Sequence, residues 1–134
     1  MNIAGIDHIV LRTVKLDLML TFYCDVLGCQ VERTLSELGL TQLRAGNALI
    51  DLVEVDSLLS LQCGTVPTNT GNNLGHFCLQ LKPITNDELS AELFMHGIDS
   101  GEFFKRYGAQ GMCDSIYIED PECNIVELKS QPIG

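Results

Sequence analysis

Residues 75–79, GHFCL, repeat residues 7–11, DHIVL, at an offset of 68 residues. Two further matches continue the repeat: Gly97 follows Gly28 at 69 residues, and residues 123–129 (CNIVELK) follow 47–53 (NALIDLV) at 76. A slowly growing offset is expected of two copies of one module that differ by a few loop residues. Two copies of about 60 residues are too few for a solenoid, which needs at least about three repeats. We therefore expect two small modules that bury their apolar faces against each other.

The first module has the pattern of a strand, a helix and three further strands. Residues 6–11 read as a short strand, and apolar residues at spacings of three and four predict an amphipathic helix over 16–27. Gly28 supplies the helix stop. Three strands are predicted at 29–34, 41–44 and 48–55.

The second module repeats this order after a polar, turn-rich stretch. A strand at 76–81 leads to a helix that residues 86–88 can cap and that runs to about Met95. Strands are predicted near 98–102, 115–119 and 125–129, with a loop at 105–111. The sequence thus predicts an α+β chain, a single domain over 1–134 built of module 1–60, linker 61–74 and module 75–134.

Composition excludes several classes of function. The net charge of −10 disfavours nucleic acids and anionic membranes, and no apolar run approaches the roughly 20 residues of a membrane span. The first residues lack the basic and apolar regions of a signal peptide, so we expect a cytoplasmic protein. Six cysteines without Cys-x-x-Cys spacing then favour free thiols, although an even count also allows disulfides.

Two histidines and two carboxylates occupy equivalent positions in the modules. His8 and His76 lie on the first strand of each copy, and Asp51 and Glu127 on the last. A lone strand carboxylate usually faces solvent and a lone strand histidine is usually structural, but the paired placement inside apolar runs favours a metal site. Two imidazoles and two carboxylates suit Ni, Co, Mn, Fe or Zn. His96, at the predicted end of a helix, is interpreted as structural.

Four stretches of the chain resemble the vicinal oxygen chelate superfamily, which includes glyoxalase I and the fosfomycin-resistance, bleomycin-resistance and extradiol dioxygenase proteins. The stretches are residues 6–11 (IDHIVL), 22–28 (FYCDVLG), 75–77 (GHF) and 119–128 (EDPECNIVEL). The last is the most specific, since the family has an Asp-Pro-x-Gly-Asn turn before a ligand glutamate. The resemblance implies two βαβββ modules forming a curved mixed sheet around a metal. It also implies a homodimer, with the site inside one chain or shared between subunits. By position, the implied metal ligands are His8, Asp51, His76 and Glu127.

Two residues depart from the family pattern. Asp51 stands where glyoxalase I has glutamate and is one methylene shorter, so it ligates directly, through water or not at all; three ligands suffice in some members. Glu54 is a poor substitute because strand alternation points it to the other face. Cys123 replaces the turn glycine at a position that often has positive φ. An ordinary turn substitution explains Cys123 better than a reactive thiol does.

The function implied is a metal-dependent enzyme acting on a small oxygen-chelating substrate, most concretely a lactoylglutathione-lyase-type isomerisation. Glu127 is the candidate base, with Asp51 as its counterpart. In the 105–111 loop, Arg106 and Tyr107 are candidate substrate contacts, although an exposed connector is an equal alternative.

Two other functions stay open. His8, His76 and Glu127 alone match the pattern of a non-haem iron dioxygenase, for which no acid or base is clearly placed. A small-molecule binding protein without chemistry, as in antibiotic resistance, is the third reading, and such relatives commonly lack the metal residues. The same fold hosts all three functions.

Overall fold

The computed structural model describes residues 1–57 and 74–132, and the predicted linker 61–74 therefore lies almost wholly outside the described residues. The chain divides into two compact units, Met1–Gly71 and Asn72–Gly134. None of the helices in the described part of the chain is long and apolar enough to span a bilayer.

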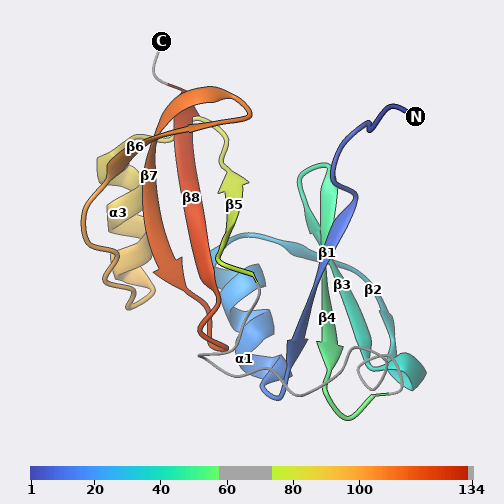
Figure 1. The fold of residues 1–134 in the computed structure, drawn as a ribbon. Coiled ribbons are helices and arrows are strands. Elements are labelled where there is room, and N and C mark those ends of the chain that lie inside the picture. The colour runs from blue at the N-terminus through green and yellow to red at the C-terminus, as the bar shows by residue number, and fades with distance from the viewer. Residues whose placement is uncertain (58–73, 133–134) are drawn as a thin grey trace. The chain divides into compact units, whose positions relative to one another are not determined.

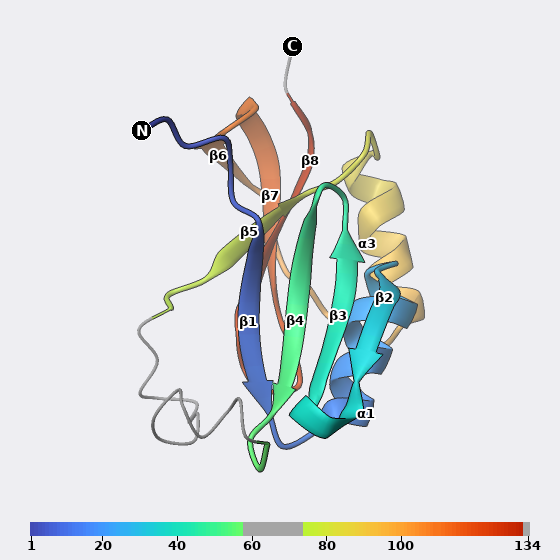
Figure 2. The same cartoon turned by 90° about the vertical axis from the view of Figure 1, so that its right-hand side faces the viewer.

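The first unit is a four-stranded mixed sheet with a helix after its first strand and a short 3-10 turn between its second and third strands (Figures 1 and 2). Its strand order is β1-β4-β3-β2, with β1 and β4 parallel and the other neighbours antiparallel. The elements are β1 (His8–Thr13), α1 (Leu16–Leu20), η1 (Thr21–Val26), β2 (Gln30–Leu35), η2 (Ser36–Leu38), β3 (Leu40–Ala45) and β4 (Ala48–Glu54).

The second unit repeats this topology. Its strand order is β5-β8-β7-β6, again with the first and last strands parallel and adjacent. The elements are β5 (Phe77–Gln80), α3 (Asn86–Met95), β6 (Phe104–Gly108), β7 (Gly111–Glu119) and β8 (Ile125–Pro132). The predicted α+β class and the tandem βαβββ modules are confirmed.

Apolar side chains form the core of each unit. In the first, the helical residues Met19, Phe22 and Tyr23 are buried along with the strand residues Leu43 and Ile50. In the second, the buried apolar residues are Leu89, Leu93, Ile116, Val126 and Leu128. In the first unit, the apolar spacing that predicted the helix includes its buried residues Met19, Phe22 and Tyr23.

Both predicted helices form, with differences at their ends. The second half of the 16–27 helix is a π-helical turn, in which the Leu27 amide donates to the Phe22 carbonyl five residues back at 3.1 Å. The cap of α3 is Thr85, one residue before the predicted segment. Thr85 and Glu88 form a capping box in which each side chain accepts from the other's amide.

Two predictions for the second unit are wrong. Residues 98–102 are not a strand, and the expected 105–111 loop is the hairpin of β6 and β7. Gly101, at φ 72°, interrupts an extended run before β6. Phe104 and Tyr107 suit a pleated strand, and Gly111, at φ 91°, allows the tight turn that the glycine-rich segment makes. Two glycines here indicate a hairpin turn and not a flexible loop.

The turn before β8 is held by one buried aspartate. The Asp120 carboxylate accepts from the amides of Glu122 and Asn124 at 2.9 Å each and from the Asn124 side chain at 2.8 Å. Cys123 adopts φ 65° in this turn, as the family pattern implies, and among the described residues it is the non-glycine with positive φ. The left-handed conformation disfavours any side chain with a Cβ.

Replacing Cys123 by glycine should stabilise the protein. The substitution removes a Cβ from a left-handed position and should raise the free energy of unfolding by about 1 kcal/mol. Urea unfolding of Cys123→Gly tests this, with Cys123→Ala as the matched control because it loses the thiol and keeps the Cβ. Equal stability of the two variants would contradict the prediction.

Candidate functional site

Each unit brings together one predicted histidine and its carboxylate. His8 Nε2 lies 3.9 Å from Asp51 Oδ2, and His76 Nε2 lies 3.1 Å from Glu127 Oε1. The two carboxylates are buried, at 7% and 6% side-chain exposure, and the two imidazoles are half exposed, at 45% and 46%. Each pair thus has one buried carboxylate and one accessible imidazole on the same face of a sheet.

The topology explains why these pairs form. The last strand of each unit lies between the first and third strands, so each of its side chains has neighbouring side chains from both of these strands. In the first unit Val10 is opposite Asp51, and in the second Cys78 is opposite Glu127. Each histidine lies two residues before the residue that is opposite its carboxylate. A carboxylate in such a central strand is costly unless it is paired.

In the first unit, the group that pairs with the buried Asp51 carboxylate is a side-chain amide. Gln42, opposite Asp51 on β3, donates its Nε2 to both Asp51 oxygens at 3.2 Å. Arg33 on β2 donates its Nε to Gln42 Oε1 at 2.5 Å. On the first-strand side, Asp7 contacts His8 Nδ1 at 2.7 Å, which leaves Nε2 facing Asp51. One polar residue from each strand therefore forms a row across the sheet.

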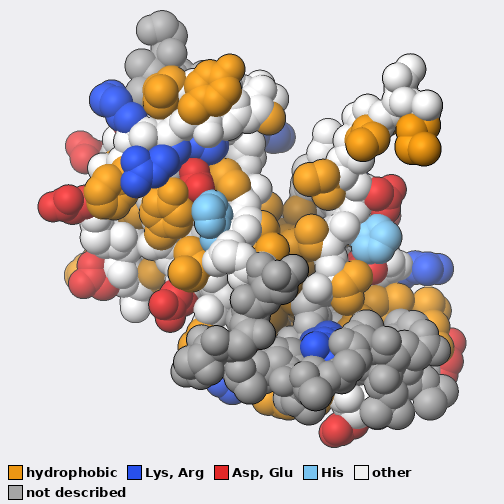
Figure 3. Space-filling model, in the orientation of Figure 1, with side chains coloured by type: hydrophobic (Ala, Val, Ile, Leu, Met, Phe, Trp, Pro, Cys, Tyr) orange, Lys and Arg blue, Asp and Glu red, His pale blue; other side chains and the backbone are white. Residues whose placement is uncertain are grey.

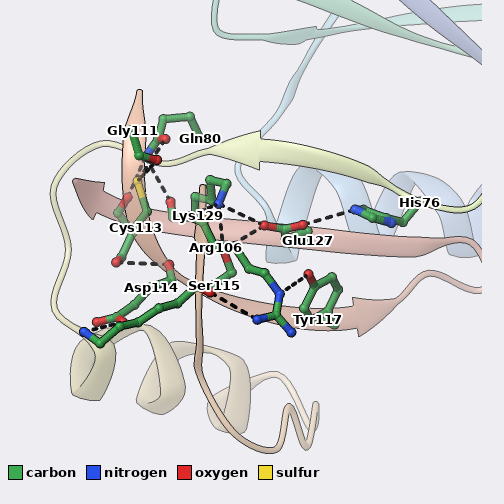
Figure 4. A network of polar contacts seen from close by, with 12 residues as sticks. His76, Gln80, Arg106, Gly111, Cys113, Asp114, Ser115, Tyr117, Glu127 and Lys129 are labelled. Carbon is green, nitrogen blue, oxygen red and sulfur yellow. Dashed lines mark hydrogen bonds and ion pairs between the residues drawn. The ribbon is translucent and has the colours of Figure 1, made fainter. Parts of the chain in front are cut away.

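The second unit has an equivalent row with stronger donors (Figure 4). Tyr117, opposite Glu127 on β7, takes the place of Gln42, and its hydroxyl accepts from Arg106 Nε at 3.3 Å. Glu127 Oε2 accepts from Ser115 Oγ at 2.7 Å and contacts Lys129 Nζ at 3.1 Å. Glu127 Oε1 faces His76, whose ring packs edge-on against Tyr117 at 5.7 Å. Histidine, acidic and basic side chains reach the surface together on this unit (Figure 3).

These contacts shift two pKa values. The hydrogen bond to Asp7, helped by the charge of Asp51, raises the pKa of His8 above its usual value. Burial alone would raise the pKa of Glu127, but hydrogen bonds from Ser115, Lys129 and Tyr117 outweigh it and hold that pKa below its usual value. Glu127 is therefore an ionised, oriented carboxylate.

The two candidate substrate contacts, Arg106 and Tyr107, lie on opposite faces of β6. Arg106 belongs to the row in the second unit: it packs over the Phe104 ring at 4.9 Å and donates to Tyr117. Tyr107 is its neighbour on β6, so its exposed ring lies on the opposite face of the strand. Glu54 is exposed at the end of β4, and His96 ends α3.

Sequence reasoning missed the residues that hold the carboxylates. Gln42, Ser115 and Lys129 were not singled out; Ser115 begins and Lys129 ends a predicted strand. Strand register supplies the missing signal. Gln42 is opposite Asp51, and Ser115 is opposite Lys129, which lies two residues from Glu127 on the same strand.

The donor set fits a divalent metal. Neutral imidazole nitrogens and ionised carboxylate oxygens are the ligands such ions take. Hydrogen bonds with neighbouring residues orient two of these groups: Asp7 orients His8 in the first unit, and Ser115 orients Glu127 in the second. Within residues 1–57 and 74–132, no three His, Cys, Asp or Glu side chains are grouped so that they could hold a metal ion; each unit has one histidine–carboxylate pair.

Replacing Asp7 by asparagine should lower the pKa of His8. The wild-type pKa should lie above 6.5, and loss of the hydrogen-bonded carboxylate should move it down toward that value. NMR titration of the imidazole protons measures this, and the His96 resonances in the same spectra serve as an internal control. An unchanged His8 titration in Asp7→Asn would mean that Asp7 does not hold the ring.

Comparison with known proteins identifies the family of this chain. The family model for the Glyoxalase/Bleomycin resistance protein/Dioxygenase superfamily matches residues 5–128. No curated protein matches the chain in sequence.

Solved structures share the fold along nearly the whole chain. A virulence protein from Salmonella typhimurium is 26% identical with a TM-score of 0.72, over 97% of this chain and 98% of that one. A lactoylglutathione lyase from Agrobacterium tumefaciens is 22% identical with a TM-score of 0.69, over 97% and 96%. A fosfomycin resistance protein, FosX, from Listeria monocytogenes is 20% identical with a TM-score of 0.68, over 98% and 97%. The chain belongs to the Glyoxalase/Bleomycin resistance protein/Dioxygenase superfamily.

Proposed function

We propose that this protein is a divalent-metal-dependent enzyme that acts on a small oxygen-chelating molecule. The proposed ligands are His8 and Asp51 from the first unit with His76 and Glu127 from the second, within one chain or across a homodimer. The observation that carries the proposal is the repeated pair: in each unit a buried carboxylate faces a half-exposed imidazole. Because the pair occurs at equivalent positions in both units, a shared function explains it better than chance does.

The metal would act as a Lewis acid on two neighbouring substrate oxygens. Glu127 would be the better-oriented ligand, since Ser115 and Lys129 hold one of its oxygens and leave Oε1 toward His76. Asp51 would be held less firmly, by the single amide of Gln42. Its shorter side chain and weaker partner leave Asp51 the freer of the two carboxylates.

The most concrete reaction is an isomerisation of the lactoylglutathione lyase type. Such a reaction moves a proton between neighbouring carbons, so it needs a carboxylate that can accept and return it. Glu127 remains the proposed base, with Asp51 as its counterpart. Arg106, on the site face of β6, could meet an anionic end of the substrate. Tyr107 stays a candidate contact for a part of the substrate that reaches the other face.

One observation favours a non-haem iron dioxygenase as the second candidate. That chemistry needs an acid or base beside the metal, and Tyr117 lies against both His76 and Glu127. His8, His76 and Glu127 would then be the three ligands. A binding protein without chemistry is the outcome if the site binds metal and ligand but supports neither reaction.

Metal binding is the first test of the proposal. The protein should bind Co²⁺, and both His76→Ala and Glu127→Gln should weaken binding by more than the roughly 10–100-fold that loss of an outer-shell partner causes. Glu54→Gln is the matched control, because it removes an exposed carboxylate from the end of β4. Calorimetric titration of chelator-treated protein gives the affinities. Equal loss in Glu54→Gln would show that only overall charge matters.

Asp51→Asn separates the four-ligand from the three-ligand arrangement. If Asp51 is a ligand, Co²⁺ affinity should fall by at least about tenfold, whereas a change below about twofold would assign the site to the other three residues. The amide is isosteric with the carboxylate, so the variant should fold normally. Thermal unfolding of the metal-free variant checks this.

Turnover tests the reaction. Protein loaded with Ni²⁺ or Zn²⁺ should convert the hemithioacetal of methylglyoxal and glutathione, and Glu127→Gln should lower kcat by about 10²–10⁴-fold, the usual contribution of general acid–base catalysis. Absorbance of the thioester product follows the reaction. No metal-dependent turnover, together with Fe²⁺-dependent oxygen uptake on a catechol, would select the dioxygenase.

A further inference from the structure

The second unit contains a buried lysine that the proposed function does not use. Lys129 has 7% of its side chain exposed, and its ammonium group lies 3.1 Å from Glu127 Oε2. It also donates to Ser115 Oγ at 3.1 Å and to the Arg106 backbone carbonyl at 2.9 Å. Three contacts satisfy its three donors, so the group is fixed in place (Figure 4).

The first unit has no such group at the equivalent position. Lys129 and Ser115 are opposite each other on β8 and β7, and the matching pair on β4 and β3 is Val53 and Leu40. Both of these are buried and apolar. The fold of the module therefore closes equally well with an apolar pair, and packing does not require the lysine.

A buried ammonium group carries a desolvation cost that an apolar pair avoids. Because Val53 and Leu40 fill the same place without that cost, a role in the site explains Lys129 better than a role in stability. Its charge has a direct effect. Two neutral imidazoles, two carboxylates and a divalent ion sum to zero, and Lys129 adds one positive charge to this set.

We propose that Lys129, held by Ser115, fixes Glu127 as a one-oxygen ligand and strengthens the binding of chelators whose oxygens carry a negative charge, such as small 2-hydroxy or 2-oxo carboxylates. The proposal rests on the metal site proposed above. Lys129 does not touch the reacting atoms in this arrangement: it positions Glu127 and sets the charge of the site. Arg106, whose carbonyl accepts from Lys129, places a second positive group on the same face.

Lactate and lactamide test the proposal, because they have the same shape and the same chelating oxygens and differ by one charge. Each is titrated into Co²⁺-saturated protein, with the visible spectrum of the ion as the readout. In Lys129→Met, the lactate Kd should rise about tenfold and the lactamide Kd should change by less than about twofold. Lys105→Met is the matched control, since it removes a lysine that is 70% exposed from β6; it should behave as wild type.

A second variant guards against a folding defect. Ser115→Leu combined with Lys129→Val installs the apolar pair of the first unit, and it should lose the preference for lactate to the same extent. Thermal unfolding of both metal-free variants confirms that they fold. Equal changes for lactate and lactamide, or wild-type values for both, would overturn the assignment of Lys129. Failure of wild-type protein to bind Co²⁺ would instead contradict the metal site itself.

Discussion

The requirement that a buried carboxylate have a partner governs the polar face of each unit. Asp51 and Glu127 lie on the central last strands, where a bare carboxylate would cost several kcal/mol. The residues around them follow from that need: an amide or a hydroxyl from the neighbouring strand, an ammonium group from the same strand as Glu127, and a histidine from the first-strand side. Most of the other buried side chains among the described residues are apolar, so these rows stand out as the part that packing alone does not require.

The two rows answer the same need with unequal means. Gln42 gives Asp51 an uncharged donor, whereas Ser115 and Lys129 give Glu127 a hydroxyl and a full positive charge. The ammonium group adds a Coulombic attraction to the carboxylate that an amide lacks. The same geometry therefore occurs twice, with one carboxylate held more firmly than the other. Such a difference suits a site in which two acids have separate tasks.

The repeat in the sequence predicted most of the fold and the four central residues. The match of GHFCL with DHIVL located the two histidines and that of CNIVELK with NALIDLV the two carboxylates, because matched positions in duplicated modules meet matched environments. The β6–β7 hairpin was misread, since Gly108 and Gly111 resemble a loop unless the pairing of Tyr107 with Met112 is known. Ser115 and Lys129 were missed for a related reason: their importance depends on lying across the ladder from each other, and register is not visible in composition or spacing.

The parallel pairing of first and last strands has a kinetic consequence. His76 and Glu127 are 51 residues apart, and the strand that carries Glu127 is the last of its unit. Contacts this distant in sequence form late in folding, after the helix and the local hairpin. An incompletely made unit therefore exposes a lone histidine that has not yet met its buried carboxylate.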